Sequence, residues 1–291
     1  MRILSRAKGN AEEYARWSVN PILGCPHRCS YCYLRKGAWA DKLGSDIPHF
    51  KKGIIGESHA FYIAMSEIIE NRDQIVRDGG LLMSFVTDPL HPICRYLFLE
   101  IAYHATKHHG IPVTILSKSV INNSEESLSK QYFKLAASSE CTSLLAFGAT
   151  LTGHDEMEPY APTNRQRIAQ LVDYHNLGFR TWASIEPVID FDSSYEMIER
   201  ALDAGVRHFK IGLLTRATKV VRGNYLILDC AEFIEKVANL TKYRDATVYW
   251  KQSVYDLLRG TKNGKGLEEQ QISELFSQPH FVGKEWSMFS G

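Results

Sequence analysis

The stretch Gly24-Cys25-Pro26-His27-Arg28-Cys29-Ser30-Tyr31-Cys32-Tyr33 places three cysteines within eight residues. Three thiolates so close together can hold one inorganic centre. An iron–sulfur cube needs a ligand at each iron, and this spacing supplies three protein ligands. The sequence therefore predicts a [4Fe–4S] cluster on Cys25, Cys29 and Cys32, with one iron left open for a substrate or cofactor.

Two other interpretations of the three cysteines remain open. The first is an iron–sulfur protein that only carries electrons, which the absence of a fourth local cysteine disfavours. The second is a zinc-bound nucleic-acid-binding protein, although zinc normally takes four ligands in paired short spacings. His27 lies inside the motif, and we expect it to be solvated or bonded to the backbone rather than to be a fourth ligand.

Composition indicates an ordinary soluble protein. The chain has 291 residues, of which 44% are hydrophobic, and 34 Lys and Arg balance 33 Asp and Glu. This near-neutral charge gives no support for nucleic acid or membrane partners, although it leaves room for a local basic groove. Cys94, Cys141 and Cys230 are isolated, which is typical of a reducing compartment. With no apolar run long enough for a membrane span and no signal-peptide core, we expect a cytoplasmic protein.

Short apolar runs alternate with helical patterns at intervals of about 30 residues, which favours repeated βα units and a parallel sheet. The expected strands are Trp17 to Leu23, Leu81 to Val86, Pro112 to Leu116, Leu144 to Leu151, Thr181 to Ile185, His208 to Leu213 and Thr247 to Lys251. Six or seven such units predict an α/β fold, a partial (β/α)6-type barrel of parallel strands with a C-terminal extension.

One domain is the simplest organisation, because no linker divides the chain. We expect an N-terminal extension at 1–16, a barrel core at 17–259 and a C-terminal tail at 260–291. The glycine-rich stretch from Arg35 to Ser58 is predicted to be a loop or insertion after the cluster motif. Loops of this length in compact domains are usually functional or mobile.

Polar residues close the expected strands on one rim. In barrels of βα units, function gathers at the carboxyl ends of the strands, where the cysteines also lie. The candidate side chains on this rim are Thr87, Asp88, Ser117, Lys118, Thr150 and Glu186. Lys251 and Gln252, after the last expected strand, are also placed to reach the barrel mouth.

The spacing C-x3-C-x2-C followed by Tyr33 resembles the cluster motif of the radical S-adenosylmethionine (SAM) enzymes. Four further segments make the resemblance narrower, and point to spore photoproduct lyase and its radical SAM relatives. These segments are Tyr31-Cys32-Tyr33-Leu34, Thr87-Asp88-Pro89, Ile115-Leu116-Ser117-Lys118-Ser119, and Ala149-Thr150-Leu151-Thr152 with Glu158, Pro159 and Arg167 following. The resemblance covers roughly Trp17 to Pro187.

This resemblance implies an enzyme that uses an electron to split SAM into a 5′-deoxyadenosyl radical, which then abstracts hydrogen from a substrate. It implies a low-potential electron donor such as flavodoxin or ferredoxin, and it leaves lyase and transferase reactions both open. Lys118 is expected to bind the SAM carboxylate, and Asp88 or Glu186 its ammonium or ribose. Thr87, Ser117 and Thr150 are expected to meet its neutral polar atoms.

Tyr31 and Tyr33 flank the last cysteine, where the lyase family carries tyrosines that pass a hydrogen atom, and Tyr31 is also expected to lie beside the cofactor. The chain departs from the lyase on its second strand. The lyase has a hydrogen-donating cysteine there, whereas this chain reads Met83-Ser84-Phe85-Val86. Repair of thymine dimers is therefore not expected, and the substrate stays unidentified, with nucleotides and nucleic acid among the classes to consider.

Overall fold

The computed structural model of the chain describes residues 2–36, 40–121, 133, 137, 140–214, 226–260 and 266–283. The strands are β1 (Leu4–Arg6), β2 (Trp17–Val19), β3 (Ile22–Leu23), β4 (His49–Phe50), β5 (Leu81–Met83), β6 (Val113–Ser117), β7 (Leu145–Thr150), β8 (Arg180–Val188), β9 (His208–Leu213), β10 (Thr247–Trp250) and β11 (Phe281–Val282). The α-helices are α1 (Ala40–Leu43), α2 (Glu57–Glu70), α3 (Arg72–Arg77), α4 (Arg95–His109), α6 (Asn164–Asn176), α7 (Phe191–Asp203), α8 (Ile227–Lys242), α9 (Gln252–Leu258) and α10 (Glu269–Leu275). Short 3-10 turns are η1 (Gly9–Glu13), η2 (Tyr33–Arg35), η4 (Glu140–Leu144) and η5 (Asp155–Met157).

A nine-stranded sheet forms the centre of the molecule, in the order β1-β2-β5-β6-β7-β8-β9-β10-β11. All neighbours from β2 to β11 run parallel, and only β1 is antiparallel to its neighbour. The edge strands β1 and β11 do not pair with each other in the described part of the chain, so the sheet is open. The predicted α/β class and partial barrel of parallel strands are confirmed.

All seven predicted strands are present in this sheet, with one division. The predicted strand from Trp17 to Leu23 splits into β2, which stays in the main sheet, and β3, which leaves it. β3 pairs antiparallel with β4, with Ile22 opposite Phe50. The stretch predicted as a loop from Arg35 to Ser58 therefore contains α1 and β4.

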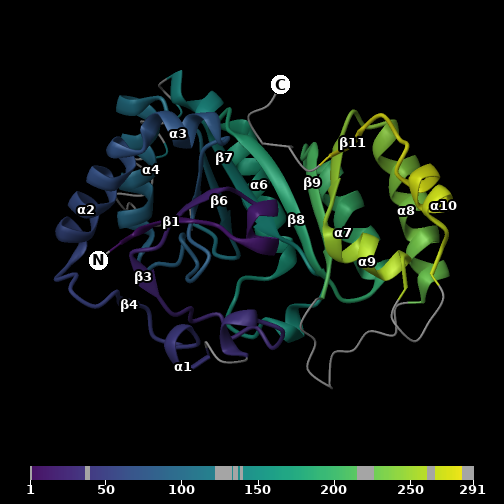
Figure 1. Cartoon of the computed structure of the whole chain (residues 1–291), viewed down its shortest axis with the longest axis horizontal. Coiled ribbons are helices and arrows are strands. Elements are labelled where there is room, and N and C mark those ends of the chain that lie inside the picture. Colours follow the sequence, from purple (N-terminus) through teal and green to yellow (C-terminus); the bar gives the residue numbers. More distant parts are fainter. Residues whose placement is uncertain are drawn as a thin grey trace.

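Both ends of the chain add strands that the sequence pattern did not reveal. β1 lies in the expected N-terminal extension and pairs with β2, and β11 lies in the expected tail and pairs with β10. After β1, the chain crosses the middle of the sheet through η1, as the purple segment in Figure 1 shows. Residues 261–265 and 284–291 of the expected tail lie outside the described residues.

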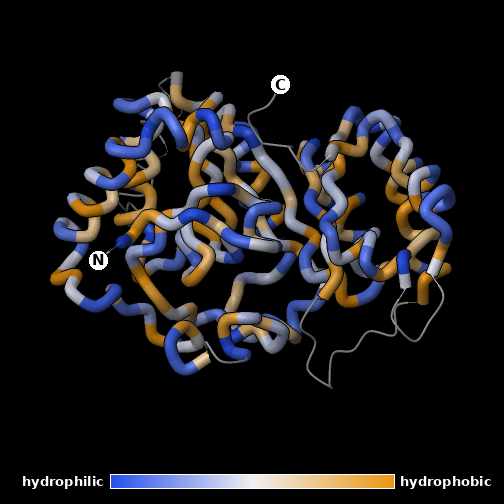
Figure 2. The backbone as a smooth tube through the Cα atoms, in the orientation of Figure 1, coloured by the Kyte–Doolittle hydropathy of each residue, from blue (hydrophilic) through white to orange (hydrophobic). Residues whose placement is uncertain are grey.

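Amphipathic helices cover the two flanks of the sheet. Figure 1 shows α2 and α4 along one flank and α7, α8 and α10 along the other, and Figure 2 shows their alternating hydrophilic and hydrophobic turns. The sequence sets the helix ends locally: Thr163 caps α6 by accepting the Gln166 N–H, and Gly110, with φ 62°, ends α4. Among the described residues, no helix combines the length and the apolar character that crossing a bilayer requires.

Candidate functional site

The three motif cysteines lie together in the loop between β3 and η2, and all are free thiols. Cys29 is buried, while Cys25 and Cys32 are half-buried. The loop begins at Gly24, whose φ is +89° and where a Cβ atom would lie 2.8 Å from the carbonyl oxygen of Ile47. Only glycine fits this left-handed conformation and close approach without strain. The Cys25 N–H donates to the Ser45 carbonyl at 2.9 Å, which fixes the loop against the following segment.

His27 fastens this loop to the rim of the barrel. Its side chain is buried, with Nδ1 3.1 Å from the Tyr160 carbonyl oxygen and Nε2 3.0 Å from Ser119 Oγ and 3.1 Å from Asp88 Oδ2. The expectation of a backbone bond holds, but the ring is buried rather than solvated. Both ring nitrogens are occupied by protein partners, so His27 acts as an anchor of the loop.

Asp88 follows β5 and connects it to β6. Its buried carboxylate accepts the Ser117 hydroxyl at 2.6 Å, the Lys118 N–H at 2.7 Å and the Leu90 N–H at 3.1 Å, in addition to the contact with His27. Burial alone would raise the pKa of Asp88, but the neighbouring His27 and these hydrogen bonds hold the pKa well below its ordinary value. The carboxylate is therefore ionised, and both of its oxygens have partners within the protein.

Lys118 projects from the end of β6 toward the cysteine loop. Its Nζ lies 3.8 Å from Glu158 Oε1 and 5.5 Å from the centre of the Tyr31 ring. Burial alone would lower the pKa of Lys118, but the nearby Cys29 thiol and Glu158 carboxylate outweigh it and raise the pKa. A cationic ammonium thus lies beside the cysteines with only a loose ion pair.

A buried network behind Lys118 holds Glu158 in place. Arg167 Nη2 lies 2.5 Å from Glu158 Oε2, and Arg167 also donates to the carbonyl oxygens of Pro162 at 2.7 Å and Thr150 at 2.9 Å. The Tyr31 hydroxyl donates to Glu158 Oε1. Burial and the Glu158 charge raise the pKa of Tyr31, so this phenol stays protonated. Tyr31 therefore lies beside Lys118, and the Thr150 carbonyl is joined to this network through Arg167.

Tyr33 lies on the other side of the last cysteine. Its hydroxyl donates to the Phe85 carbonyl oxygen, and 51% of the residue is exposed. Although much of the residue is exposed, burial of the phenol among protein atoms raises the pKa of Tyr33. The charges of Cys32 and Glu186 raise this pKa further. Thr87 is buried two residues beyond Phe85 and donates its N–H to Ser84 Oγ at 3.1 Å.

Glu186 belongs to a second group of polar side chains, toward β10. Lys251 Nζ lies 2.8 Å from both carboxylate oxygens of Glu186. The Tyr14 hydroxyl also donates to Glu186 and lies 2.8 Å from Ser184 Oγ. Room for the Lys251 and Glu186 pair comes from Gly212, where a Cβ atom would lie 2.8 Å from Lys251 Cδ and 3.2 Å from Glu186 Cδ.

The N-terminal segment completes this second group. Lys210 of β9 is buried and donates through Nζ to the carbonyl oxygens of Glu13 at 2.7 Å and Tyr14 at 3.3 Å. The Glu13 carboxylate accepts the Gln252 N–H at 2.7 Å and lies 3.5 Å from Lys251 Nζ. Burial lowers the pKa of Lys210 to about 7, and the neighbouring Lys251 adds to this effect.

The structure thus gathers most predicted site residues around the cysteines and places Glu186 in the second group. Sequence reasoning missed the roles of His27, Glu158, Arg167 and Tyr14. His27 and Glu158 stood within or beside recognised motifs, which was a usable signal. Tyr14 carried none, because its partners lie about 170 residues or more away along the chain.

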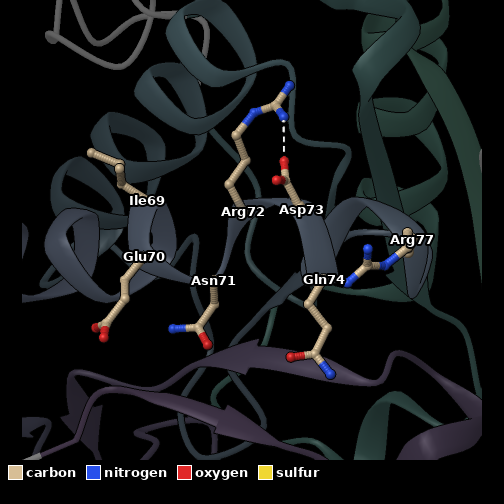
Figure 3. A pocket seen from close by; sticks show the side chains of 7 residues that line it. All are labelled: Ile69, Glu70, Asn71, Arg72, Asp73, Gln74 and Arg77. Carbon is tan, nitrogen blue, oxygen red and sulfur yellow. Dashed lines mark hydrogen bonds and ion pairs between the residues drawn. The ribbon is translucent and has the colours of Figure 1, made fainter.

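One surface pocket of about 300 Å³ lies elsewhere, at the junction of α2 and α3 (Figure 3). Its lining is Ile69, Glu70, Asn71, Arg72, Asp73, Gln74 and Arg77. Arg72 and Asp73 pair across it at 2.7 Å. None of the predicted site residues lines this pocket. Within the described residues, no three His, Cys, Asp or Glu side chains are arranged to hold a single metal ion.

Comparison with known proteins supports the fold. No sequence profile of a known family matches the chain. An uncharacterised protein of Methanocaldococcus jannaschii is 24% identical over 240 residues, which are 79% of this chain and 82% of the relative. A structure of spore photoproduct lyase aligns with a TM-score of 0.60 and 14% identity, over 84% of this chain and 78% of the lyase.

Two other radical SAM structures align similarly. Streptococcus suis SuiB bound to SAM gives a TM-score of 0.57 at 12% identity over 88% of this chain, which spans about half (54%) of SuiB. A radical SAM methyltransferase from Sphaerobacter thermophilus gives 0.50 at 16% identity, over 82% of this chain and 67% of that protein. The chain therefore has the fold of the radical SAM proteins, in a form similar to spore photoproduct lyase.

Proposed function

We propose that the chain is a radical SAM enzyme, with a [4Fe–4S] cluster on Cys25, Cys29 and Cys32 and SAM on the open iron. The observation that carries this proposal is the placement of three free thiols beside the ammonium of Lys118, at the carboxyl edge of an open parallel barrel. A protein that only carries electrons does not require an ammonium and a rim of polar side chains beside its cluster.

The residues fit this cofactor pair chemically. Thiolates are the ligands of iron–sulfur clusters, and three of them from one short loop leave one iron for another ligand. Cys141 and Cys230 are buried and lie far from the motif in the sequence. When bound, the cluster supplies the electron that cleaves SAM and releases the 5′-deoxyadenosyl radical.

Lys118 would bind the carboxylate of SAM. Its ammonium is cationic and lies 3.8 Å from Glu158, a distance longer than a direct hydrogen bond. Glu158 and Arg167 form the rigid support behind it. Asp88 contributes indirectly, because it holds the Lys118 backbone and the Ser117 hydroxyl rather than presenting free oxygens.

Of the two tyrosines beside the cluster loop, we assign hydrogen transfer to Tyr33. The Tyr31 hydroxyl is buried and bonded to Glu158, which is itself paired with Arg167. The Tyr33 side chain is partly exposed, and its hydroxyl donates to one backbone carbonyl. Tyr33 is thus the phenol that a substrate radical can reach. Glu186 is held by Lys251 and Tyr14 in the second group of polar side chains.

The substrate is a separate part of the proposal, with its own assay. Structures of spore photoproduct lyase contain a dinucleoside photoproduct, so nucleotides are the first class to assay. Deuterium from labelled SAM, followed by mass spectrometry into candidate substrates, identifies the molecule that loses hydrogen. The same measurement shows whether SAM is consumed or regenerated.

Anaerobic reconstitution tests the proposal directly. The protein should take up about four irons and four sulfides per chain, absorb broadly in the visible range, and form 5′-deoxyadenosine from SAM after reduction. Cys25→Ala, Cys29→Ala and Cys32→Ala should each lose the absorbance and the cleavage. Cys94→Ala, Cys141→Ala and Cys230→Ala serve as matched controls and should keep both. One zinc per chain, or equal iron loss in Cys141→Ala, contradicts the proposal.

A further inference from the structure

The segment that carries the three cysteines is strongly basic. From Gly24 to Gly56 it contains six Lys and Arg and two Asp, a formal charge of +4, whereas the whole chain carries +1. The rest of the chain is therefore net acidic, at −3. This segment, with β3, β4 and α1, forms a small lobe at the lower left of Figure 1, which we call the cluster lobe.

Two arginines of the lobe share one carboxylate directly beside the cysteine loop. Arg28 Nε lies 2.9 Å from Asp46 Oδ2, and Arg35 Nη1 lies 2.5 Å from Asp46 Oδ1. The same segment contacts the loop backbone, because the Cys25 N–H donates to Ser45. One negative charge cannot neutralise two guanidinium groups, so the positive potential remains at the surface nearest the cysteines.

Exposed residues of the kind that anchor protein interfaces lie at the same place. Ile47 is 74% exposed, and its carbonyl oxygen would lie 2.8 Å from a Cβ atom at Gly24. Tyr160 is 60% exposed, with the Arg28 guanidinium 4.9 Å from its ring centre. Tyr and Arg are enriched among the residues that dominate interface energies, and a basic rim around an apolar contact steers acidic partners.

We infer that the cluster lobe is the docking surface for an acidic one-electron donor protein that carries a flavin or an iron–sulfur centre. The inference rests on the proposed function and names its partner. Arg28, Arg35, Ile47 and Tyr160 form the contact, and Lys42 and Lys52 add long-range attraction. In the step itself one electron leaves the reduced donor and enters the oxidised cluster, and no bond forms or breaks. Docking beside the cysteines shortens the path, which matters because electron transfer slows steeply with distance.

The test compares two ways to reduce the same cluster. Stopped-flow absorbance follows reduction of the SAM-loaded enzyme by reduced flavodoxin, and separately by photoreduced deazaflavin, which needs no protein docking. The variant Lys42→Glu/Lys52→Glu leaves the cysteines and the Asp46 contacts intact. The control Lys107→Glu/Lys242→Glu makes the same charge change on exposed residues of α4 and α8.

For the lobe variant we expect the bimolecular rate with flavodoxin to fall by about tenfold at low salt, since electrostatic steering contributes about 10- to 1000-fold. The difference in this rate between the lobe variant and the parent should vanish at about 0.5 M salt, where charges are screened within a few ångströms. Reduction by deazaflavin should not change, and the control variant should stay within about twofold of the parent.

Four results would count against the inference. Equal slowing in the control variant would show an effect of total charge only. An unchanged flavodoxin rate would remove the lobe from donor docking, and loss of duplex DNA binding in the same variant would make it a nucleic-acid surface instead. Slowing with deazaflavin as well would place the damage in the cluster. If the parent forms no cluster, the proposed function fails separately, and calorimetric titration of the apo chain with oxidised flavodoxin still decides whether the lobe binds it.

Discussion

The side chains of His27 and Asp88 meet at 3.1 Å, between Nε2 and Oδ2, and both are buried. One residue belongs to the cysteine loop and the other to the end of β5. Because Asp88 also accepts the Lys118 N–H at 2.7 Å, a single carboxylate sets the position of the cluster loop and of the ammonium that faces it. The two halves of the proposed cofactor site are thereby held in one frame.

Asp88→Asn should weaken the contacts that join the cysteine loop to the Lys118 backbone. The substitution replaces one acceptor oxygen of Asp88 with an amide donor, which then faces groups that also donate. Such a buried mismatch costs about 1 to 3 kcal/mol of folding free energy. We expect a lower melting temperature, reduced iron content and weaker SAM binding although Lys118 is present. Thermal unfolding and iron analysis measure the first two effects. Asp203→Asn, which removes an exposed ion pair with Arg244, should change neither.

Lys118→Ala should weaken SAM binding without loss of iron. A charge-assisted hydrogen bond to a partly buried carboxylate contributes about 1.5 to 3 kcal/mol, which corresponds to roughly one to two decades in Kd. Calorimetry on the reconstituted protein gives the affinity. Lys107→Ala, an exposed lysine of α4, is the control. An unchanged Kd in Lys118→Ala would remove this residue from the SAM site.

Tyr33→Phe separates hydrogen transfer from packing, because the ring remains and only the hydroxyl is lost. We expect the cluster and SAM cleavage to persist while product formation slows or is diverted. The yield of product per 5′-deoxyadenosine is the informative ratio. Tyr62→Phe, on an exposed tyrosine of α2, should leave that ratio unchanged. An unaltered ratio in Tyr33→Phe would reduce Tyr33 to a packing residue.

Thymine dimers should not be repaired by the reduced protein with SAM. The position of the lyase thiol on the second strand is occupied by Met83-Ser84-Phe85, and Cys94 is buried with its thiol 3.2 Å from the Asp88 carbonyl oxygen. Chromatography of damaged DNA after incubation detects restored thymines. Conversion would direct attention to Cys94 or to a relay through Tyr31 and Tyr33.

Lys210→Met should change the pH dependence of stability. Burial lowers the pKa of Lys210 to about 7, whereas an unfolded lysine titrates near 10.4. Between these values the unfolded chain binds more protons, so the stability of the parent rises with pH. The parent should therefore gain relative to the variant from about pH 7 to 10, by on the order of a few kcal/mol, and denaturant titrations across this range measure the gain. Parallel curves would show that Lys210 titrates normally.

The sequence predicted the parts of this molecule that local patterns encode. The seven strands followed from apolar runs, and their parallel arrangement followed from the alternation of strands with helices. The rest depended on contacts between distant segments. His27 could not be matched with Asp88, nor Tyr14 with Glu186, because contacts between distant segments leave no periodic signal in the chain.

The attachment of the first residues to the last strands has a consequence for how the chain is made. Glu13 accepts the N–H of Gln252, a contact between residues 239 positions apart. A ribosome makes Gln252 long after Glu13, and contacts of such long range form slowly. The group formed by Tyr14, Glu186 and Lys251 can therefore assemble only after Lys251 has been made, well after synthesis of the cysteine loop.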